Sequence, residues 1–224
     1  MDLFDAFPAL RRYPLLSGKK VALVGISTIA YTDSAYYFEV GKPKYWQQYK
    51  SDATTTTIVG VGGIGGTIKQ GESVMACLRR EAEEELGVRV RLVLSRQTYL
   101  IHDWQIVDTL NLPPSKKRPT PLMVILVPPR LGGPGIPDHL AIVAFHTRLR
   151  GMPVPRDLFG LLRVESRALA DFFSRDEWPL DEAQAHPGLT IVLNDQLPPG
   201  SVLRPVLTAR AFQLLIRAGC DMWS

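Results

Sequence analysis

Three glutamates, Glu81, Glu84 and Glu85, have a spacing that could assemble a metal site. On an α-helix, residues at positions i, i+3 and i+4 share one face, so these carboxylates would lie side by side. Like charges at this spacing repel each other, and a divalent cation such as Mg²⁺ or Mn²⁺ would turn that repulsion into ligation by oxygen. Acidic runs also occur on solvated helix faces, so the spacing alone leaves both readings open.

A glycine cluster precedes the glutamates and could bring the backbone close to a ligand. Because glycines carry no side chain, their amides and carbonyls are accessible to phosphate or metal. Glycine-rich loops are weak indicators when they stand alone. The cluster consists of Gly60, Gly62, Gly63, Gly65 and Gly66.

Glu72 and Arg80 are the remaining charged residues of interest in this stretch. They are eight residues apart, about two helical turns, which is too far for a direct pair within one helix. We expect them to meet only if Glu72 lies on the incoming loop and that loop folds back over the helix.

The segment from Gly66 to Val88, GTIKQGESVMACLRREAEEELGV, matches the Nudix box, G-x5-E-x7-R-E-U-x-E-E-x-G-U, where U is a bulky apolar residue. One position departs from it, since Ala82 stands where a larger aliphatic residue is usual. The seven fixed positions all agree, and they are Gly66, Glu72, Arg80, Glu81, Glu84, Glu85 and Gly87. The chain therefore resembles the Nudix hydrolases.

The resemblance implies an α/β/α sandwich that hydrolyses a nucleoside diphosphate linked to another moiety, X. Water would attack a phosphorus of the pyrophosphate, with Mg²⁺ or Mn²⁺ as the cofactor. By position in the motif, Glu81, Glu84 and Glu85 would hold metal, and Glu81 is also a candidate base. The carbonyl of Gly66 or Gly65 would add a ligand. Glu72 and Arg80 would form an internal ion pair that fixes the loop on the helix.

The family often uses a further carboxylate from a loop before a late strand. Asp157 occupies a comparable place in PVPRDLFGLLRV, and Asp138 and Glu165 are competitors. An ordinary surface aspartate before a strand is the alternative for Asp157.

Two other groups of residues could contact a substrate. Lys116, Lys117 and Arg118 could bind phosphates or simply keep a loop soluble. Tyr45 and Trp46 could stack on a base, or form a lid or dimer contact. No residue pattern here identifies X.

Hydrophobic periodicity predicts the elements that position these residues. A helix is expected over residues 72–86, and two more over 167–173 and 205–218. Loops are expected over 41–54 and 113–121. Strands are expected over 20–28, 35–40, 55–61, 88–94, 98–101, 122–127, 139–149 and 159–164. Strands interleaved with few helices favour an α/β fold with a mixed sheet covered by helices.

Length and composition limit the classes of protein to which the chain can belong. The 224 residues are 46% hydrophobic and 21% charged, which excludes wholesale disorder. We expect one domain over residues 1–224, with a core at about 20–175 and N- and C-terminal extensions. Two cysteines, Cys77 and Cys220, without metal-type spacing, argue against a disulfide framework or a zinc cluster.

The same data suggest partners and location. The net charge of +4 is far from that of a dedicated DNA-binding protein, so a small-molecule nucleoside diphosphate derivative is expected and nucleic acid is not. No run is long enough to cross a bilayer and no secretory signal is visible, so a cytoplasmic protein is expected. A homodimer is a further expectation.

The main alternative function is a Nudix-fold sensor that binds a nucleotide or nucleotide sugar without cleaving it. Such proteins usually lose glutamates of the box, whereas this chain keeps Glu81, Glu84 and Glu85, which favours catalysis. An isomerase acting on a prenyl diphosphate is a third option. It would need its own cysteine, and Cys77 is expected on the buried face of the box helix.

Overall fold

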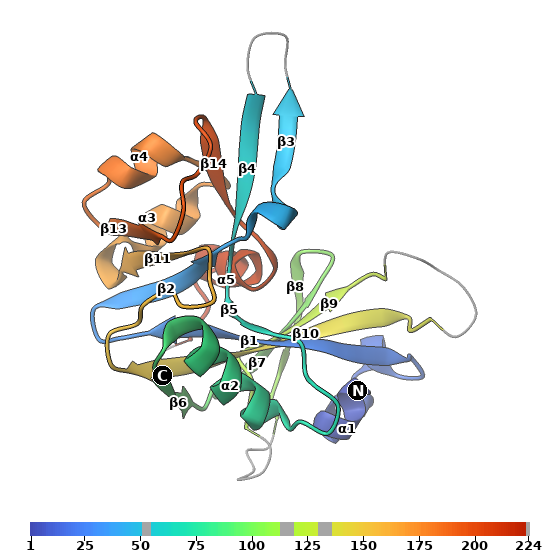
Figure 1. Ribbon diagram of the computed structural model, residues 1–224. Coiled ribbons are helices and arrows are strands. Elements are labelled where there is room, and N and C mark those ends of the chain that lie inside the picture. Colours follow the sequence, from blue (N-terminus) through green and yellow to red (C-terminus); the bar gives the residue numbers. More distant parts are fainter. Residues whose placement is uncertain (51–54, 113–118, 130–135, 223–224) are drawn as a thin grey trace.

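A mixed β-sheet forms the frame of the protein (Figure 1). The computed structural model describes residues 1–50, 55–112, 119–129 and 136–222. The strands within these residues are β1 (Val21–Tyr31), β2 (Ala35–Val40), β3 (Gln47–Lys50), β4 (Thr55–Gly62), β5 (Ile64–Gly66), β6 (Arg89–Val93), β7 (Thr98–His102), β8 (Gln105–Leu110), β9 (Met123–Val127), β10 (His139–Arg150), β11 (Gly160–Glu165), β12 (Trp178–Pro179), β13 (Leu189–Leu193) and β14 (Ser201–Pro205).

The strand order shows why the sheet is mixed. Its main row runs β12-β14-β4-β2-β1-β10-β9-β7-β8. The pairs β1–β10, β4–β14 and β7–β9 are parallel, and the other pairs are antiparallel. Antiparallel β6 extends β10 beyond β9, and antiparallel β5 lies against β1. The mixed sheet confirms the α/β class predicted from the sequence.

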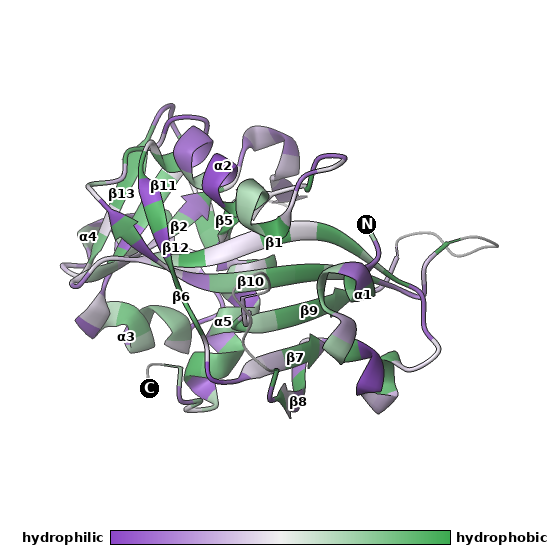
Figure 2. Ribbon diagram, turned by 90° about the horizontal axis from the view of Figure 1, so that it is seen from below, coloured by the Kyte–Doolittle hydropathy of each residue, from purple (hydrophilic) through white to green (hydrophobic). Residues whose placement is uncertain are grey.

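Helices cover the sheet on both sides. Figure 2 shows α2 on one side of β1 and β10, and α3 and α5 on the other, which gives the expected α/β/α layers. No helix in the described ranges is both long and apolar enough to span a membrane. The α-helices are α1 (Leu3–Ala6), α2 (Val74–Leu86), α3 (Leu169–Ser174), α4 (Leu180–Ala185) and α5 (Leu207–Arg217), with 3₁₀ turns at Pro8–Arg12, Pro14–Leu16, Pro43–Tyr45 and Ser166–Ala168.

Helix α2 carries the glutamates, and its two ends are set by local sequence. The side chain of Ser73 caps the first turn by accepting a hydrogen bond from the amide of Ala76 at 3.2 Å. Gly87 ends the helix in the left-handed conformation, with φ of 67°. The helix thus starts at Val74, two residues later than the predicted residue 72, because Ser73 takes the capping position. Glu72 therefore lies outside the helix.

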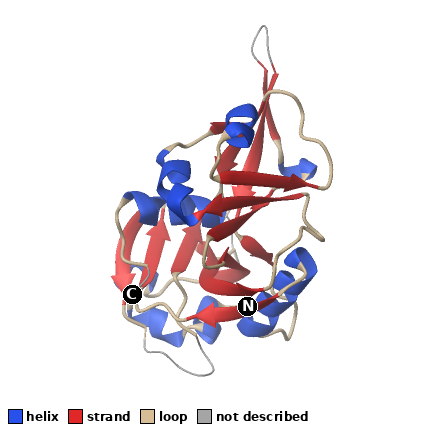
Figure 3. Ribbon diagram, turned by 90° about the vertical axis from the view of Figure 1, so that its left-hand side faces the viewer, coloured by secondary structure: helices blue, strands red, loops and turns tan. Residues whose placement is uncertain are grey.

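The predicted loop over residues 41–54 contains a strand, β3, which forms a hairpin with β4. Figures 1 and 3 both show this hairpin projecting from the rest of the molecule. All four residues of β3 are exposed, so they have none of the alternation that reveals a half-buried strand. This is the physical reason why the sequence did not indicate it.

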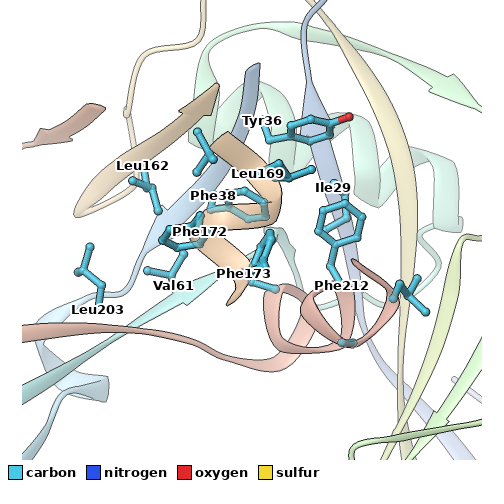
Figure 4. Packing of buried hydrophobic residues seen from close by; sticks show 14 of the residues in the cluster. Ile29, Tyr36, Phe38, Val61, Leu162, Leu169, Phe172, Phe173, Leu203 and Phe212 are labelled. Atoms are coloured by element: carbon cyan, nitrogen blue, oxygen red, sulfur yellow. The ribbon is translucent and has the colours of Figure 1, made fainter. Parts of the chain in front are cut away.

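The C-terminal segment, predicted as an extension, contributes to both sheet and core. Strand β14 pairs with β4, as Leu203 opposite Val59 illustrates. On α5, Phe212 is fully buried and lies at ring-centroid distances of 5.6 Å from Phe173 and 6.4 Å from Phe38 (Figure 4). The predicted helix over 205–218 is therefore present, shortened to Leu207–Arg217, and part of the main core.

This packing makes a prediction about stability. Replacing Phe212 with Ala removes a buried ring and leaves a cavity, so the free energy of unfolding should fall by about 3–5 kcal/mol. Replacing Met152, which is 76% exposed, with Ala should change it by less than about 0.5 kcal/mol. Urea unfolding of both variants measures the difference. Equal stabilities would show that α5 is not integral to the core.

Candidate metal centre

A close contact between helix α2 and the backbone of Gly65 and Gly66, here called the glycine turn, forms the centre of the site. Strand β5 is held against β1, with Gly65 opposite Ser27 and Gly66 opposite Ile26. A Cβ built on Gly66 would lie 2.3 Å from Oε1 of Glu81, so a larger residue here would force that carboxylate out of its present position. The amide of Gly65 donates a hydrogen bond to Oε2 of Glu85 at 2.9 Å. Two of the three predicted glutamates therefore face the glycine turn.

Arg80 binds the carboxylates that surround it. Its Nε and Nη2 donate to the two oxygens of Glu72 at 2.8 and 2.9 Å, a bidentate ion pair. Its Nη1 donates to Glu81 at 2.7 Å and to Glu84 at 3.0 Å. Hydrogen bonding to Glu72 is the main cause that raises the pKa of Arg80, and the same bonds lower the pKa of Glu72.

Glu72 lies before the helix, on the incoming loop. The amide of Lys69 donates to its Oε2 at 3.0 Å, which closes a turn around the carboxylate. The loop therefore folds back over α2, which is the arrangement that the eight-residue spacing between Glu72 and Arg80 requires. The resulting ion pair ties the glycine turn, the loop and the helix together.

Glu85 is buried, and among the described residues it forms no salt bridge, although the charge of Lys42 acts on it. Burial is the main cause that raises its pKa to about 8, and the neighbouring charge of Glu39 raises it further. Burial likewise raises the pKa of Glu39 to about 7, with Asp157 and Glu81 adding to the effect and Lys42 opposing it. These mutual effects show that Glu39, Glu81 and Glu85 share one local electrostatic environment.

Glu39 is the residue that sequence reasoning missed. It lies on β2, paired with Gly62 of β4 and with Leu161 of β11, so it reaches the site from the sheet rather than from the motif. A single glutamate in the strand AYYFEV carries no motif. The signal available in the sequence was one charged residue, Glu39, within an otherwise apolar strand.

Asp157 lies next to the C-terminal end of α2. Its amide bonds to the carbonyl of Glu84 at 3.3 Å, and its side chain, 78% exposed, is 3.4 Å from Nζ of Lys42. The two competitors are engaged elsewhere. Asp138 accepts from the amide of Lys20 at 2.7 Å, and Glu165 binds two arginines, Arg163 and Arg167.

The other candidates fall into three groups. Lys116, Lys117 and Arg118 lie outside the described residues. Trp46 is half-buried with its ring edge-to-face on Phe159 at 5.2 Å, and its indole N–H donates to Gly41, so it serves packing. Tyr45 is 67% exposed. Cys77 is fully buried, which confirms its expected place in the core.

The donor set fits a hard divalent cation, because it consists of carboxylate oxygens next to backbone carbonyls. In the described ranges, no three His, Cys, Asp or Glu side chains already form a group that could hold an ion. Arg80 explains this, since its guanidinium holds Glu81 and Glu84. A cation would have to compete with Arg80 for these two carboxylates, and its binding would displace the protons of Glu85 and Glu39 into solvent.

The raised pKa values of Glu85 and Glu39 predict how stability depends on pH. A carboxyl whose pKa is raised by folding binds more protons when folded, so stability falls as pH rises towards the folded pKa. His146, with a pKa lowered to about 4, opposes this trend only below about pH 6.5. The metal-free protein should therefore lose stability between pH 6.5 and 8.

Thermal unfolding of the metal-free protein at several pH values measures this loss. Glu85→Gln removes the group with the higher of the two values, so its melting temperature should depend less steeply on pH over the same range. Identical slopes for the two proteins would mean that Glu85 is already ionised near pH 6.5.

Comparison with known proteins gives the family. A model of the NUDIX domain matches residues 46–186, more than half of the chain. No curated protein matches in sequence. The solved structures that the chain matches include the ORF135 protein of E. coli, with 15% identity, a TM-score of 0.32, and coverage of 64% of this chain and 74% of that one.

Two further solved structures are Nudix hydrolases. One, from Clostridium perfringens, has 15% identity and a TM-score of 0.37, and the match covers 66% of this chain and 83% of that one. The other, a MutT Nudix hydrolase from Burkholderia pseudomallei, has 15% identity and a TM-score of 0.36, and the match covers 87% of this chain and 95% of that one. The assignment rests on the domain match and on the box built around Arg80. The chain therefore belongs to the NUDIX domain family, the Nudix hydrolases.

Proposed function

We propose that this Nudix hydrolase uses Mg²⁺ or Mn²⁺ to cleave the pyrophosphate bond of a nucleoside diphosphate linked to another moiety, X, by attack of water at phosphorus. The family implies pyrophosphate hydrolysis of nucleoside diphosphate derivatives. The observation that carries the proposal is the close approach of Gly66 to the Glu81 carboxylate. A merely solvated acidic face would not need a glycine at this point.

The residues have distinct roles in this proposal. Glu81, Glu84 and Glu85 hold the metal, with the carbonyl of Gly66 or Gly65 as an additional ligand. When bound, the cation neutralises pyrophosphate charge and acidifies the attacking water. Glu81 is the candidate base that takes the proton from water. Arg80 and Glu72 keep the loop in place while the substrate is bound.

Residues outside the motif complete the site. Glu39 adds a carboxylate from β2, since its charge acts on Glu85. Asp157 supplies the extra carboxylate from the loop before β11, and Lys42, 3.4 Å from it, places a cation where a substrate phosphate can bind. The partner is a small molecule.

A cytoplasmic location is part of the proposal. Both cysteines are free, as expected for a reducing compartment. A homodimer is also proposed, with exposed Tyr45 as a contact residue.

The glycine contact can be tested directly. Gly66→Ala would place a methyl group 2.3 Å from the Glu81 carboxylate and push it away, so turnover should fall by about 10²-fold or more. Gly25→Ala is a matched control, because its Cβ would meet nothing closer than 3.7 Å. Rates with Mg²⁺ on a panel of nucleoside diphosphate derivatives are compared. Equal rates for both variants would contradict the central role of this contact.

The metal ligands provide the main test. Glu84→Gln and Glu85→Gln should each weaken Mg²⁺ binding and lower turnover by about 10²-fold or more, since an amide is a poorer ligand for a hard cation. Both should stay folded, because Arg80 keeps its bonds to Glu72 and Glu81 in either variant, and Glu85, with its raised pKa, is largely uncharged before a metal binds. Mg²⁺ binding is followed by calorimetry.

The site of attack and the rival function are decided by two further results. Hydrolysis in ¹⁸O-labelled water should place the label in a phosphate product. If no derivative is cleaved with any divalent metal, while a nucleotide sugar still raises the melting temperature, the protein is a binding sensor instead.

A further inference from the structure

Strands β6 and β10 place four arginines on one face of the sheet, two of them just after the Nudix box and two on the long central strand. In the antiparallel register, Arg91 lies opposite Arg148 and Arg89 lies opposite Arg150. Residues directly opposite each other, and residues two apart on one strand, point to the same side of a sheet. The four guanidinium groups therefore form two short rows, which we call the arginine face.

The arginine face is on the side of the sheet away from α2. The residues that alternate with the arginines, Val90 and Leu149, pack with Leu86 of α2. His146, which points the same way as Arg148, packs against Phe212 of α5 instead, with ring centroids 6.1 Å apart. The arginine face thus continues the side that α5 covers, and α2 with its glutamates lies on the other side.

The charge of this face has little compensation. Arg148 forms an ion pair with Asp33. Among the described residues, no carboxylate lies within ion-pair distance of Arg89, Arg91 or Arg150, and all three are exposed. Four charges equal the formal excess of the whole chain, +4. Like charges directly opposite each other destabilise a sheet, so folding alone does not account for this arrangement.

Protection of a sheet edge explains only part of the arrangement of the four arginines. In the described residues β6 pairs with β10 alone, and charged residues on an edge strand prevent unwanted pairing with another chain. Arg148, however, has β6 on one side and β1 on the other, where its partner is Tyr31. Edge protection does not require an arginine there, nor arginine opposite arginine.

We propose that the arginine face binds the phosphate backbone of a single-stranded nucleic acid. Arginine forks bind phosphate oxygens in pairs. Residues two apart on a strand are about 6.8 Å apart and neighbouring strands about 4.8 Å apart, so the array suits a run of phosphates better than a single one. Tyr31, opposite Arg148 on the same face, is half-buried with its ring stacked on Tyr36 at 5.8 Å and tilted against His146 at 5.6 Å, so a base can stack only on the part of the ring that stays exposed.

The overall charge predicted no nucleic-acid partner, and our proposal departs from that expectation for one reason. Net charge averages over the chain, whereas binding depends on the local arrangement of charges. An anionic membrane is the less suitable partner, because the arginine face is only two strands wide and membrane attachment favours a broad basic surface with apolar side chains that insert.

The test uses the full chain and a fluorescent 20-nucleotide oligo(dT), with binding measured by anisotropy at 50 and 200 mM salt. The double variant Arg91→Gln/Arg150→Gln should bind at least 10-fold more weakly at the lower salt concentration. For this variant, the slope of log affinity against log salt concentration should be shallower by about 1.4, since two phosphate contacts are lost. The control Arg12→Gln/Arg79→Gln changes the net charge equally, at exposed arginines outside the arginine face, and should bind like the wild type.

Three results would overturn the proposal. The first is an equal loss of oligo(dT) affinity in both double variants, and the second is unchanged binding by Arg91→Gln/Arg150→Gln. The third is binding to vesicles that contain an anionic lipid without any binding to oligo(dT). Thermal unfolding accompanies each measurement. The arginine-face variant should melt at the same temperature as the wild type or higher, because like-charge repulsion is reduced, so weaker binding would not reflect unfolding.

Discussion

The site depends on how one guanidinium group distributes its hydrogen bonds. Arg80 binds Glu72 through two nitrogens and uses the third to bind Glu81 and Glu84. In the absence of metal, one positive charge within the motif therefore partly offsets the three carboxylates bound to it. The same bonds fix the loop, so the position of the glycine turn relative to the helix follows from the electrostatics of Arg80.

The sheet sets the second constraint. Strand β5 is only three residues long and is held by β1, which in turn pairs with β10 along most of its length. The backbone of Gly65 and Gly66 is thereby fixed at a distance that lets Glu85 receive an amide hydrogen bond. Burial disfavours the ionised form of Glu85, whereas a bound cation would favour it.

The sequence predicted those residues of the candidate site that are defined by their spacing along the chain. It did not predict residues that reach the site only through tertiary contacts. The motif located Glu72, Arg80 and the three glutamates, and apolar periodicity located most strands and α2. Glu39 could not be found in this way, because its role arises from the pairing of β2 with β4. Strand β3 was missed because its residues are all exposed, and β14 because a five-residue strand beside proline and glycine has no distinct pattern.

The parallel pairing of β14 with β4 has a consequence for biosynthesis. Val59 has its partner, Leu203, 144 residues later in the chain, so the ladder closes only after the segment up to β14 has left the ribosome. Contacts between such distant residues slow folding and leave strand edges unpaired in the meantime. Nascent chains stalled before β14 should therefore need chaperones to avoid aggregation.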